Sequence, residues 1–290
     1  MTRIGFVGLG RMGRAMAPHL AADGRQVTGH DLVRPDPLPA NVGFSERLEG
    51  LAGSDVIITM LPDGAAVRAV VDRLLDDGCT ASVIDMSSSH PDDSRALAAQ
   101  LAERGLSFVD APVSGGVSRA EAAGLMIMAG GTDAAVAAAM PVLSCMGRPV
   151  HLGPAGCGHA MKALNNYVSA AGLIAAFEAL ATARAAGIAP DRFHEVINAA
   201  TGRNNTTEVK IDRFVLDESY DSGFALALME KDVSIAATLM AAATRQGPLA
   251  GAVLAQLRDG LAWLGADADH TEIYRAVTRD DGVEETPRPR

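Results

Sequence analysis

Short apolar runs alternate with helical segments over the first half of the chain. The runs begin at residue 4 and recur to about residue 129, and polar or glycine residues bound each of them. Strands that alternate with helices in this way predict an α/β fold with a parallel, doubly wound sheet. The runs lie at residues 4–7, 26–31, 55–60, 81–85, 106–110 and 125–129, with helical segments such as 65–75 and 92–104 between them. Because ligands of such sheets bind at the carboxyl ends of the strands, the residues after each run are the first candidates for a site.

The first run leads directly into a glycine-rich loop. Ile4–Val7 is followed by a G-x-G-x-x-G sequence and then by a segment with helical spacing. In such a unit the first glycine permits a tight turn, the second lets the backbone approach a pyrophosphate, and the third lets the helix pack on the strand. A βα turn that only needs glycines would show the same letters, but the strand–loop–helix context favours a Rossmann dinucleotide site on the helix N-terminus. Its cofactor-binding residues are Gly8, Leu9, Gly10, Arg11, Met12 and Gly13.

An acidic residue ends the second run. A carboxylate at Asp31 would accept hydrogen bonds from the adenosine-ribose hydroxyls and repel a 2′-phosphate, so it favours NAD over NADP. Arg34, three residues further on, is placed to reach toward a 2′-phosphate, which leaves NADP open as an alternative. Two further strand ends put Leu61, Pro62 and the residues around Ser88 on the same edge of the sheet.

The second half of the chain is almost purely helical. A glycine-rich segment, 151–158, precedes a long apolar segment from about His159 to Ala186 that stops at Gly187. Further helices are predicted at 191–201, 229–244 and 248–264. We therefore predict a Rossmann domain over residues 1–155, an all-helical domain over 156–279, and a disordered tail at 280–290, which holds acids and two prolines.

Composition narrows the classes of partner. The net charge of −10 disfavours a nucleic-acid partner, which would require a basic surface. The uncharged stretch 163–177 contains two asparagines and is too short for a membrane span, so we expect no membrane partner and predict that this helix is buried between domains or subunits of a homodimer or homotetramer. The three cysteines are scattered and no signal peptide is expected, so the expected location is cytoplasmic. The seven histidines form no paired motif, so no metal site is predicted.

Lys162 is the strongest candidate for proton transfer. It follows the glycine-rich segment, and its spacing of four from Asn166 puts both side chains on one helix face. Burial beside an apolar helix and a bound nicotinamide cation would lower the pKa of its ammonium group toward the range useful for a general acid–base. A solvated lysine in the first turn of a helix is the structural alternative.

Four ordered motifs resemble those of a known family. They are the cofactor signature Gly5–Gly13, the substrate-binding signature Asp110–Val117, the catalytic signature Gly158-x-x-x-Lys162-x-x-x-Asn166, and the late cofactor-contact motif Leu228–Asp232. Over almost its whole length the chain resembles the β-hydroxyacid dehydrogenases, which include 3-hydroxyisobutyrate dehydrogenases and tartronate semialdehyde reductases.

The resemblance implies a role for each matching residue. Lys162 would be the general acid–base, with Asn166 supporting both substrate and lysine. The resemblance places the substrate carboxylate on a loop whose glycines expose N–H groups to an anion, although an ordinary Gly-Gly turn looks the same. The implied substrate-binding residues are Ser114, Gly115, Gly116, Asn165, Phe224 and Asp232, and the implied cofactor contacts beyond the glycine loop are Leu61, Pro62, Ser88 and Lys231.

Two positions depart from the family pattern or escape assignment. Ala66 stands where relatives often carry a polar cofactor contact, so that contact is expected to be lost. Arg203 is placed either to clamp a second anionic group or to lie on the surface at a helix end, and the sequence does not decide between them.

The function implied is NAD-dependent interconversion of a small 3-hydroxy acid and its semialdehyde or 3-oxo acid, at a site between the two domains. An imine reductase has the same architecture, but such enzymes generally lack a lysine at the position of Lys162. A non-catalytic dinucleotide-binding module is a third reading, and the combined presence of Ser114, Lys162, Asn166 and Lys231 argues against it.

Overall fold

The computed structural model describes residues 1–243 and 247–279. The chain divides into two compact units, Met1–Lys162 and Ala163–Arg290, which are described separately here. The sequence placed this boundary at 155/156, whereas the units divide inside a helix. The predicted disordered tail, 280–290, lies outside the described residues.

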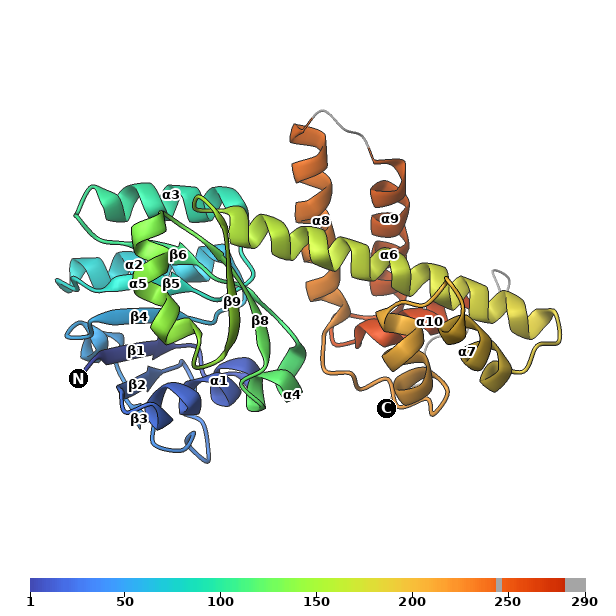
Figure 1. Cartoon of the computed structure of the whole chain (residues 1–290), viewed down its shortest axis with the longest axis horizontal. Helices are drawn as coiled ribbons and strands as arrows, with labels where there is room; N and C mark the ends of the chain where they lie inside the picture. Colours follow the sequence, from blue (N-terminus) through green and yellow to red (C-terminus); the bar gives the residue numbers. More distant parts are fainter. Residues whose placement is uncertain (244–246, 280–290) are drawn as a thin grey trace. The chain divides into compact units, whose positions relative to one another are not determined.

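The first unit is built on a sheet whose order, over the described residues, is β3-β2-β1-β4-β5-β6-β8-β7, with β9 beside β8 (Figure 1). The strands are β1 (Arg3–Val7), β2 (Gln26–His30), β3 (Gly43–Phe44), β4 (Val56–Thr59), β5 (Ser82–Asp85), β6 (Phe108–Asp110), β7 (Val113–Ser114), β8 (Leu125–Gly130) and β9 (Gly147–Gly153). The part of the sheet with the order β3-β2-β1-β4-β5-β6 is parallel throughout, which confirms the predicted Rossmann sheet. At the far end of the sheet, β8 runs antiparallel to β6 and β7 and parallel to β9.

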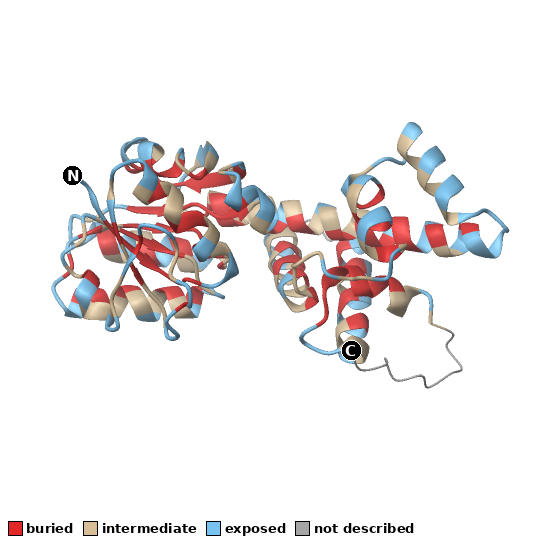
Figure 2. Ribbon diagram, turned by 90° about the horizontal axis from the view of Figure 1, so that it is seen from below, coloured by how far each residue is buried: buried red, intermediate tan, exposed pale blue. Residues whose placement is uncertain are grey.

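Helices cover both faces of this sheet because neighbouring strand residues point to opposite sides. Phe6, Ile58 and Ile84 pack with α1 (Arg11–Ala22), α4 (Gly116–Glu121) and α5 (Asp133–Leu143). Their neighbours Ile57 and Val83 pack with α2 (Gly64–Asp76) and α3 (Pro91–Ala102) on the other face. Figure 2 shows the buried residues concentrated in the strands and on the inner sides of these helices. The central strands β1, β4, β5 and β6 are therefore largely apolar and buried, and the polar residues at their carboxyl ends are candidates for function.

The second unit is helical in its described residues. Its elements are the main part of α6 (Cys157–Ala185), α7 (Pro190–Ala199), the π-helix η2 (Thr206–Val215), α8 (Leu226–Ala242), α9 (Pro248–Leu264), η3 (His270–Glu272) and α10 (Ile273–Val277). Phe177 of α6 lies at the centre of its core, packs edge-on against Tyr274 at 5.4 Å, and shares that core with Val233 of α8 and Leu257 of α9. The predicted helices agree with α6 to α9 within a few residues at each end, and the π-helix was not predicted.

Helix α6 is long and apolar. Its mean hydropathy reaches 1.3, so length and composition alone would allow it to cross a membrane, contrary to the reading of 163–177 as too short. Such a test is also passed by core helices, and Leu173, Phe177 and Leu180 of α6 are completely buried in the helical core.

One buried cation in the second unit carries a stability prediction. Lys210 lies in η2 with 8% of its surface exposed, and burial lowers the pKa of its ammonium group to about 8, against the attraction of Asp269. The unfolded chain holds this proton up to a pH near 10.5. Between these values the folded state has released a proton that the unfolded state keeps, so the contribution of Lys210 to stability rises with pH; below pH 8 the full cost of burying the charge remains.

We expect Lys210→Met to stabilise the protein at pH 7, by up to about 3 kcal/mol, because methionine fills similar space without the charge. The advantage should shrink as pH rises from 8 toward 10.5. Urea unfolding of both proteins at pH 7, 8.5 and 10 measures this difference, in which groups common to both cancel. A constant difference across the three pH values, or a less stable variant at pH 7, would contradict the account of Lys210.

Candidate functional site

The glycine loop joins β1 to α1 in a conformation that requires glycine at two positions. Gly8 has a φ of +98°, and a Cβ there would collide with the backbone oxygen of Met60. A Cβ on Gly13 would collide with the backbone oxygen of Gly8, so the third glycine brings the helix onto the loop as predicted. Tight packing of β1, loop and α1 leaves the first turn of α1 at the carboxyl end of the sheet.

Gly10 has a different reason for being glycine. It caps α1 without any side-chain hydrogen bond, its φ of −66° suits any residue, and an added Cβ would meet nothing within 4 Å. A pocket of about 710 Å³ adjoins this point. The glycine loop and two arginines contribute to its lining. The lining residues are Leu9, Gly10, Arg11, Arg14, Ala15, Pro18, His19, Val117 and Glu121. Open space, helix N–H groups and positive charge fit the pyrophosphate of a dinucleotide.

Asp31 lies directly after β2 and is tied to the glycine loop. Its Oδ2 accepts a hydrogen bond from the Leu9 N–H at 2.6 Å, so the loop and the carboxylate hold each other in place. Arg34 forms an exposed ion pair with Glu46 at 3.0 Å, and its guanidinium lies 5.3 Å from the ring centre of Phe44. A 2′-phosphate would therefore have to compete with Glu46 for Arg34, which favours the prediction of NAD.

The loops after β4 and β5 are linked through serine hydroxyls. The Leu61 N–H donates to Ser87 Oγ at 2.9 Å. Ser87 and Ser89 are buried, whereas Ser88 between them is half-buried. The predicted cofactor contact, Ser88, is thus the residue of this loop that faces outward, and Pro62 beside Leu61 is exposed.

Lys162 and the predicted carboxylate-binding loop lie together in the first unit. The Lys162 ammonium donates to the backbone oxygen of Val113 at 2.9 Å, next to Ser114 at the end of β7. Gly115 and Gly116 follow with φ values of +143° and +70°, and a Cβ on Gly116 would meet nothing within 4 Å. The structure therefore brings the candidate proton acceptor to a loop whose backbone is open to a ligand.

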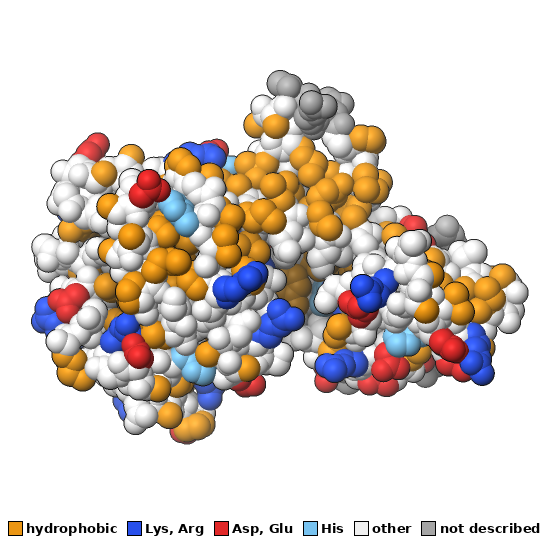
Figure 3. Space-filling view, viewed as in Figure 1, with side chains coloured by type: hydrophobic (Ala, Val, Ile, Leu, Met, Phe, Trp, Pro, Cys, Tyr) orange, Lys and Arg blue, Asp and Glu red, His pale blue; other side chains and the backbone are white. Residues whose placement is uncertain are grey.

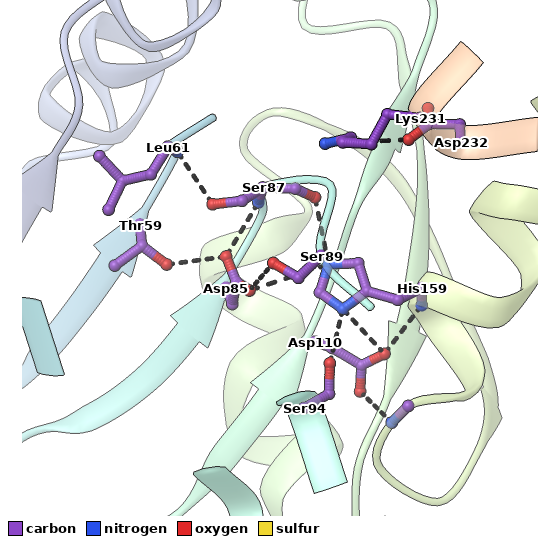
Figure 4. Close-up of polar contacts among 11 residues, drawn as sticks. Thr59, Leu61, Asp85, Ser87, Ser89, Ser94, Asp110, His159, Lys231 and Asp232 are labelled. Atoms are coloured by element: carbon purple, nitrogen blue, oxygen red, sulfur yellow. Dashed lines mark hydrogen bonds and ion pairs between the residues drawn. The ribbon is translucent and has the colours of Figure 1, made fainter. Parts of the chain in front are cut away.

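The second unit brings together Asn166, Lys231 and Asp232. The Asn166 side-chain amide donates to the buried Asp232 carboxylate at 2.5 Å, and the Asn165 amide donates to the Asn166 oxygen at 3.0 Å. Lys231 Nζ lies 3.9 Å from the other Asp232 oxygen (Figure 4). Asp232 thus orients Asn166, and its predicted contact with the substrate stays a prediction.

Phe224 is held in the second unit by a polar cluster around Asp269. The Phe224 N–H donates to Asp269 Oδ2 at 3.2 Å, and the Phe224 ring packs edge-on against His270 at 5.4 Å. Burial tends to raise the pKa of Asp269, but hydrogen bonds from His270, Thr271 and Ser222 outweigh it and lower that pKa. Burial lowers the pKa of His270.

Arg203 has an acidic neighbour. Its Nε lies 3.4 Å from Glu208, and the side chain is largely exposed. In the described residues, no group of three or more histidine, cysteine, aspartate or glutamate residues is arranged to hold a metal ion.

A buried polar network was missed by the sequence reasoning. Asp85 and Asp110 end β5 and β6, and the ring of His159 from α6 lies between them, at 3.8 and 3.7 Å (Figure 4). Burial raises the pKa of Asp110 above its usual range, against the opposing effects of His159 and of the backbone N–H groups of Gly156 and His159. Polar residues that end two adjacent buried runs were the signal available in the sequence, but their histidine partner lies far away along the chain.

Comparisons with known proteins match both units. Residues 3–157 match the family described as the NAD binding domain of 6-phosphogluconate dehydrogenase, and residues 156–277 match the one described as NAD-binding of NADP-dependent 3-hydroxyisobutyrate dehydrogenase. Both descriptions confirm the predicted class of cofactor, a nicotinamide dinucleotide.

Characterised relatives extend over most of the chain. The 2-(hydroxymethyl)glutarate dehydrogenase of Eubacterium barkeri is 35% identical over 243 residues, 81% of each chain. The mitochondrial 3-hydroxyisobutyrate dehydrogenase of Drosophila melanogaster is 37% identical over 259 residues, 85% of this chain and 80% of the relative. The solved structure of Mycobacterium tuberculosis 3-hydroxyisobutyrate dehydrogenase with L-serine is 32% identical, with a TM-score of 0.84, and the match covers 96% of this chain and 100% of that one. With these matches and the glycine loop, the serine-glycine loop and Lys162 in the expected order, the chain belongs to the β-hydroxyacid dehydrogenase family.

Proposed function

We propose that the protein oxidises a small acid whose hydroxyl group lies on the carbon β to a carboxylate, with NAD as the hydride acceptor, and that it runs the reverse reduction as well. The observation that carries this proposal is the 2.9 Å contact between Lys162 Nζ and the backbone oxygen of Val113. It places an amine beside the Ser114–Gly116 loop, where a carboxylate and the hydroxyl next to it would both be in reach.

The chain's own residues would divide the work as follows. The Ser114 hydroxyl and the N–H groups of Gly115 and Gly116 bind the carboxylate and so orient the substrate. Lys162, as the neutral amine, takes the hydroxyl proton at Nζ, and its hydrogen bond to the Val113 backbone oxygen orients that amine. The Asn166 amide, fixed by Asp232, steadies the reacting oxygen from the same face of α6. When bound, the nicotinamide supplies the acceptor for the hydride that leaves the carbinol carbon.

The substrate class follows from what the relatives have in common. Their names and the bound ligand mention 3-hydroxyisobutyrate, 2-(hydroxymethyl)glutarate and L-serine. Each of these molecules carries a hydroxyl on the carbon β to a carboxylate. They differ in the group on the α carbon, so we assign the class and leave that group to experiment.

A substrate panel tests this proposal. We expect NADH formation, followed by absorbance, from at least one of 3-hydroxyisobutyrate, L-serine, glycerate and 3-hydroxybutyrate, with NADP slower than NAD. A 2-hydroxy acid of the same size as the best substrate is the matched control and should give no reaction. Reduction of a cyclic imine without any hydroxy-acid oxidation would favour the imine reductase reading. Tight NADH binding without either activity would favour the non-catalytic module.

We also propose that the protein acts as a homodimer or homotetramer. In the helical unit, Figure 3 shows hydrophobic side chains gathered over α6, α8 and α9. Val168 is 66% exposed, and Leu164, Leu228 and Leu249 are exposed as well. An apolar surface of this kind is typical of subunit interfaces, and light scattering would give the molar mass in solution.

A further inference from the structure

The loop that presents Ser88 is held from two sides. On one side Asp85 Oδ1 accepts the Ser87 N–H at 3.0 Å, and Asp85 Oδ2 accepts the Ser89 hydroxyl at 3.0 Å. On the other side the backbone oxygen of Ser87 lies 3.1 Å from His159 Nε2, and a carbonyl oxygen there requires that the imidazole donates. The direction of Ser88 is therefore set by Asp85 within the loop and by His159 from outside it.

The first turn of α6 is fixed to the same sheet. The two oxygens of Asp110 accept the N–H groups of Gly156 and His159, at 2.8 and 2.9 Å, which supplies a buried anion to the start of the helix. A Cβ on Gly158 would collide with the backbone oxygens of Met128 and Asp110, so only glycine lets the helix begin this close to β6 and β8. Lys162 follows less than one turn after His159 on this anchored segment.

His159 joins the loop to the helix. Its side chain is fully buried, and its Nδ1 shares a 2.7 Å hydrogen bond with the Ser94 hydroxyl of α3, which fixes the ring plane. Figure 4 shows the ring between Ser87 and Asp110, with both of its nitrogens in use. Removing the ring would leave the Ser87 oxygen and the Ser94 hydroxyl without this partner and two buried carboxylates without the nearby imidazole.

We propose that His159 is a positioning residue. It fixes the position of Ser88, on the nicotinamide side of the site, relative to Lys162, on the proton-transfer side. This inference rests on the proposed function for the role of Lys162, but the link from His159 to Ser88 concerns dinucleotide binding alone. Neither His159 nor Ser94 is placed in contact with the substrate.

The test uses His159→Met, which fills the space without hydrogen bonds, and His159→Gln, whose amide can donate to the Ser87 oxygen and accept from Ser94. NADH affinity is measured by fluorescence without substrate, for the wild type, each variant, Ser88→Ala, and His159→Met combined with Ser88→Ala. We expect His159→Met to weaken NADH binding at least about fivefold, and His159→Gln to restore it to within about threefold. In the double variant the Ser88→Ala change should have almost no further effect, since a misdirected hydroxyl has no contact left to lose.

On the best substrate of the panel, His159→Met should also lower kcat at least about tenfold, whereas His159→Gln should keep most of it. If His159 had only a structural role, His159→Met would lower the melting temperature, and its effect on NADH affinity would simply add to that of Ser88→Ala. That result would overturn the proposal. If His159→Met does not fold, Ser94→Ala takes its place: weaker NADH binding coupled to Ser88 supports the proposal, and unchanged binding overturns it. Should no hydroxy acid react with the wild type, the proposed function fails, but the NADH measurements still decide the role of His159.

Discussion

Lys162→Ala is expected to lower kcat for the best hydroxy acid at least about a hundredfold, the low end for loss of a general acid–base. The amine that lies 2.9 Å from the Val113 oxygen would be gone, and alanine offers nothing to take the hydroxyl proton. Affinity for NADH should stay within about threefold of the wild type, because the glycine loop and Asp31 are untouched. Steady-state rates and NADH fluorescence titration measure the two quantities on the same preparation.

Lys162→Arg is the matched control for charge. Arginine keeps a cation at this position but stays protonated at any working pH, so it has no lone pair with which to take a proton. We expect it to be as inactive in kcat as the alanine variant. If arginine restored most of the turnover, Lys162 would act through its charge, as an anchor for the substrate, and the assignment of proton transfer would be wrong.

Asp31→Ala is expected to raise the dissociation constant for NADH at least about tenfold and to bring NADPH to equal or better affinity. A carboxylate that accepts the ribose hydroxyls contributes about 1.5–3 kcal/mol for each such hydrogen bond, and its charge repels a 2′-phosphate. The Leu9 N–H would also lose its acceptor, 2.6 Å away. Fluorescence titration with both reduced dinucleotides gives the ratio directly.

Two further variants separate these effects. Asp31→Asn keeps an acceptor for Leu9 but removes the charge, so it should relax the preference against NADPH with a smaller loss of NADH affinity. Arg34→Ala should leave NADH binding unchanged, since Arg34 is paired with Glu46. A wild-type protein that prefers NADPH, or an Asp31→Ala variant with an unchanged ratio of NADH to NADPH affinity, would contradict the interpretation of Asp31.

The sequence predicted the part of the fold that depends on local pattern. The runs that became β1, β4, β5 and β6 are largely apolar because both faces of a doubly wound sheet are buried, and this pattern can be recognised in each strand's own sequence. The two-residue strand β3 was not predicted. At the other end of the sheet β8 was predicted, but β7 and β9 beside it were not, for a physical reason. Strand β7 has two residues, and β9 contains Pro149 and is mostly exposed, so neither shows the buried-strand pattern.

The site was predictable where a motif lies in one segment. The glycine loop is such a segment, whereas the pairing of Lys162 with the carboxylate-binding loop was implied only by the family resemblance, because 49 residues separate Lys162 from Val113. The contacts of Asp85 and Asp110 with His159 were not predicted, because these residues meet only after the sheet and the start of α6 are assembled. The orientation of Asn166 by Asp232 has the same origin, since 66 residues separate the two partners.

Hydride transfer from the carbinol carbon to the nicotinamide can be measured directly with a deuterated substrate. The wild-type enzyme is mixed with NAD and with the best hydroxy acid of the panel, deuterated at the carbinol carbon, and the reduced dinucleotide is analysed by mass spectrometry. We expect the deuterium on the nicotinamide ring, in an amount equal to the dinucleotide reduced, and we expect Lys162→Ala to slow its appearance at least about a hundredfold. Reduced dinucleotide without deuterium, or transfer at an undiminished rate in Lys162→Ala, would contradict this expectation.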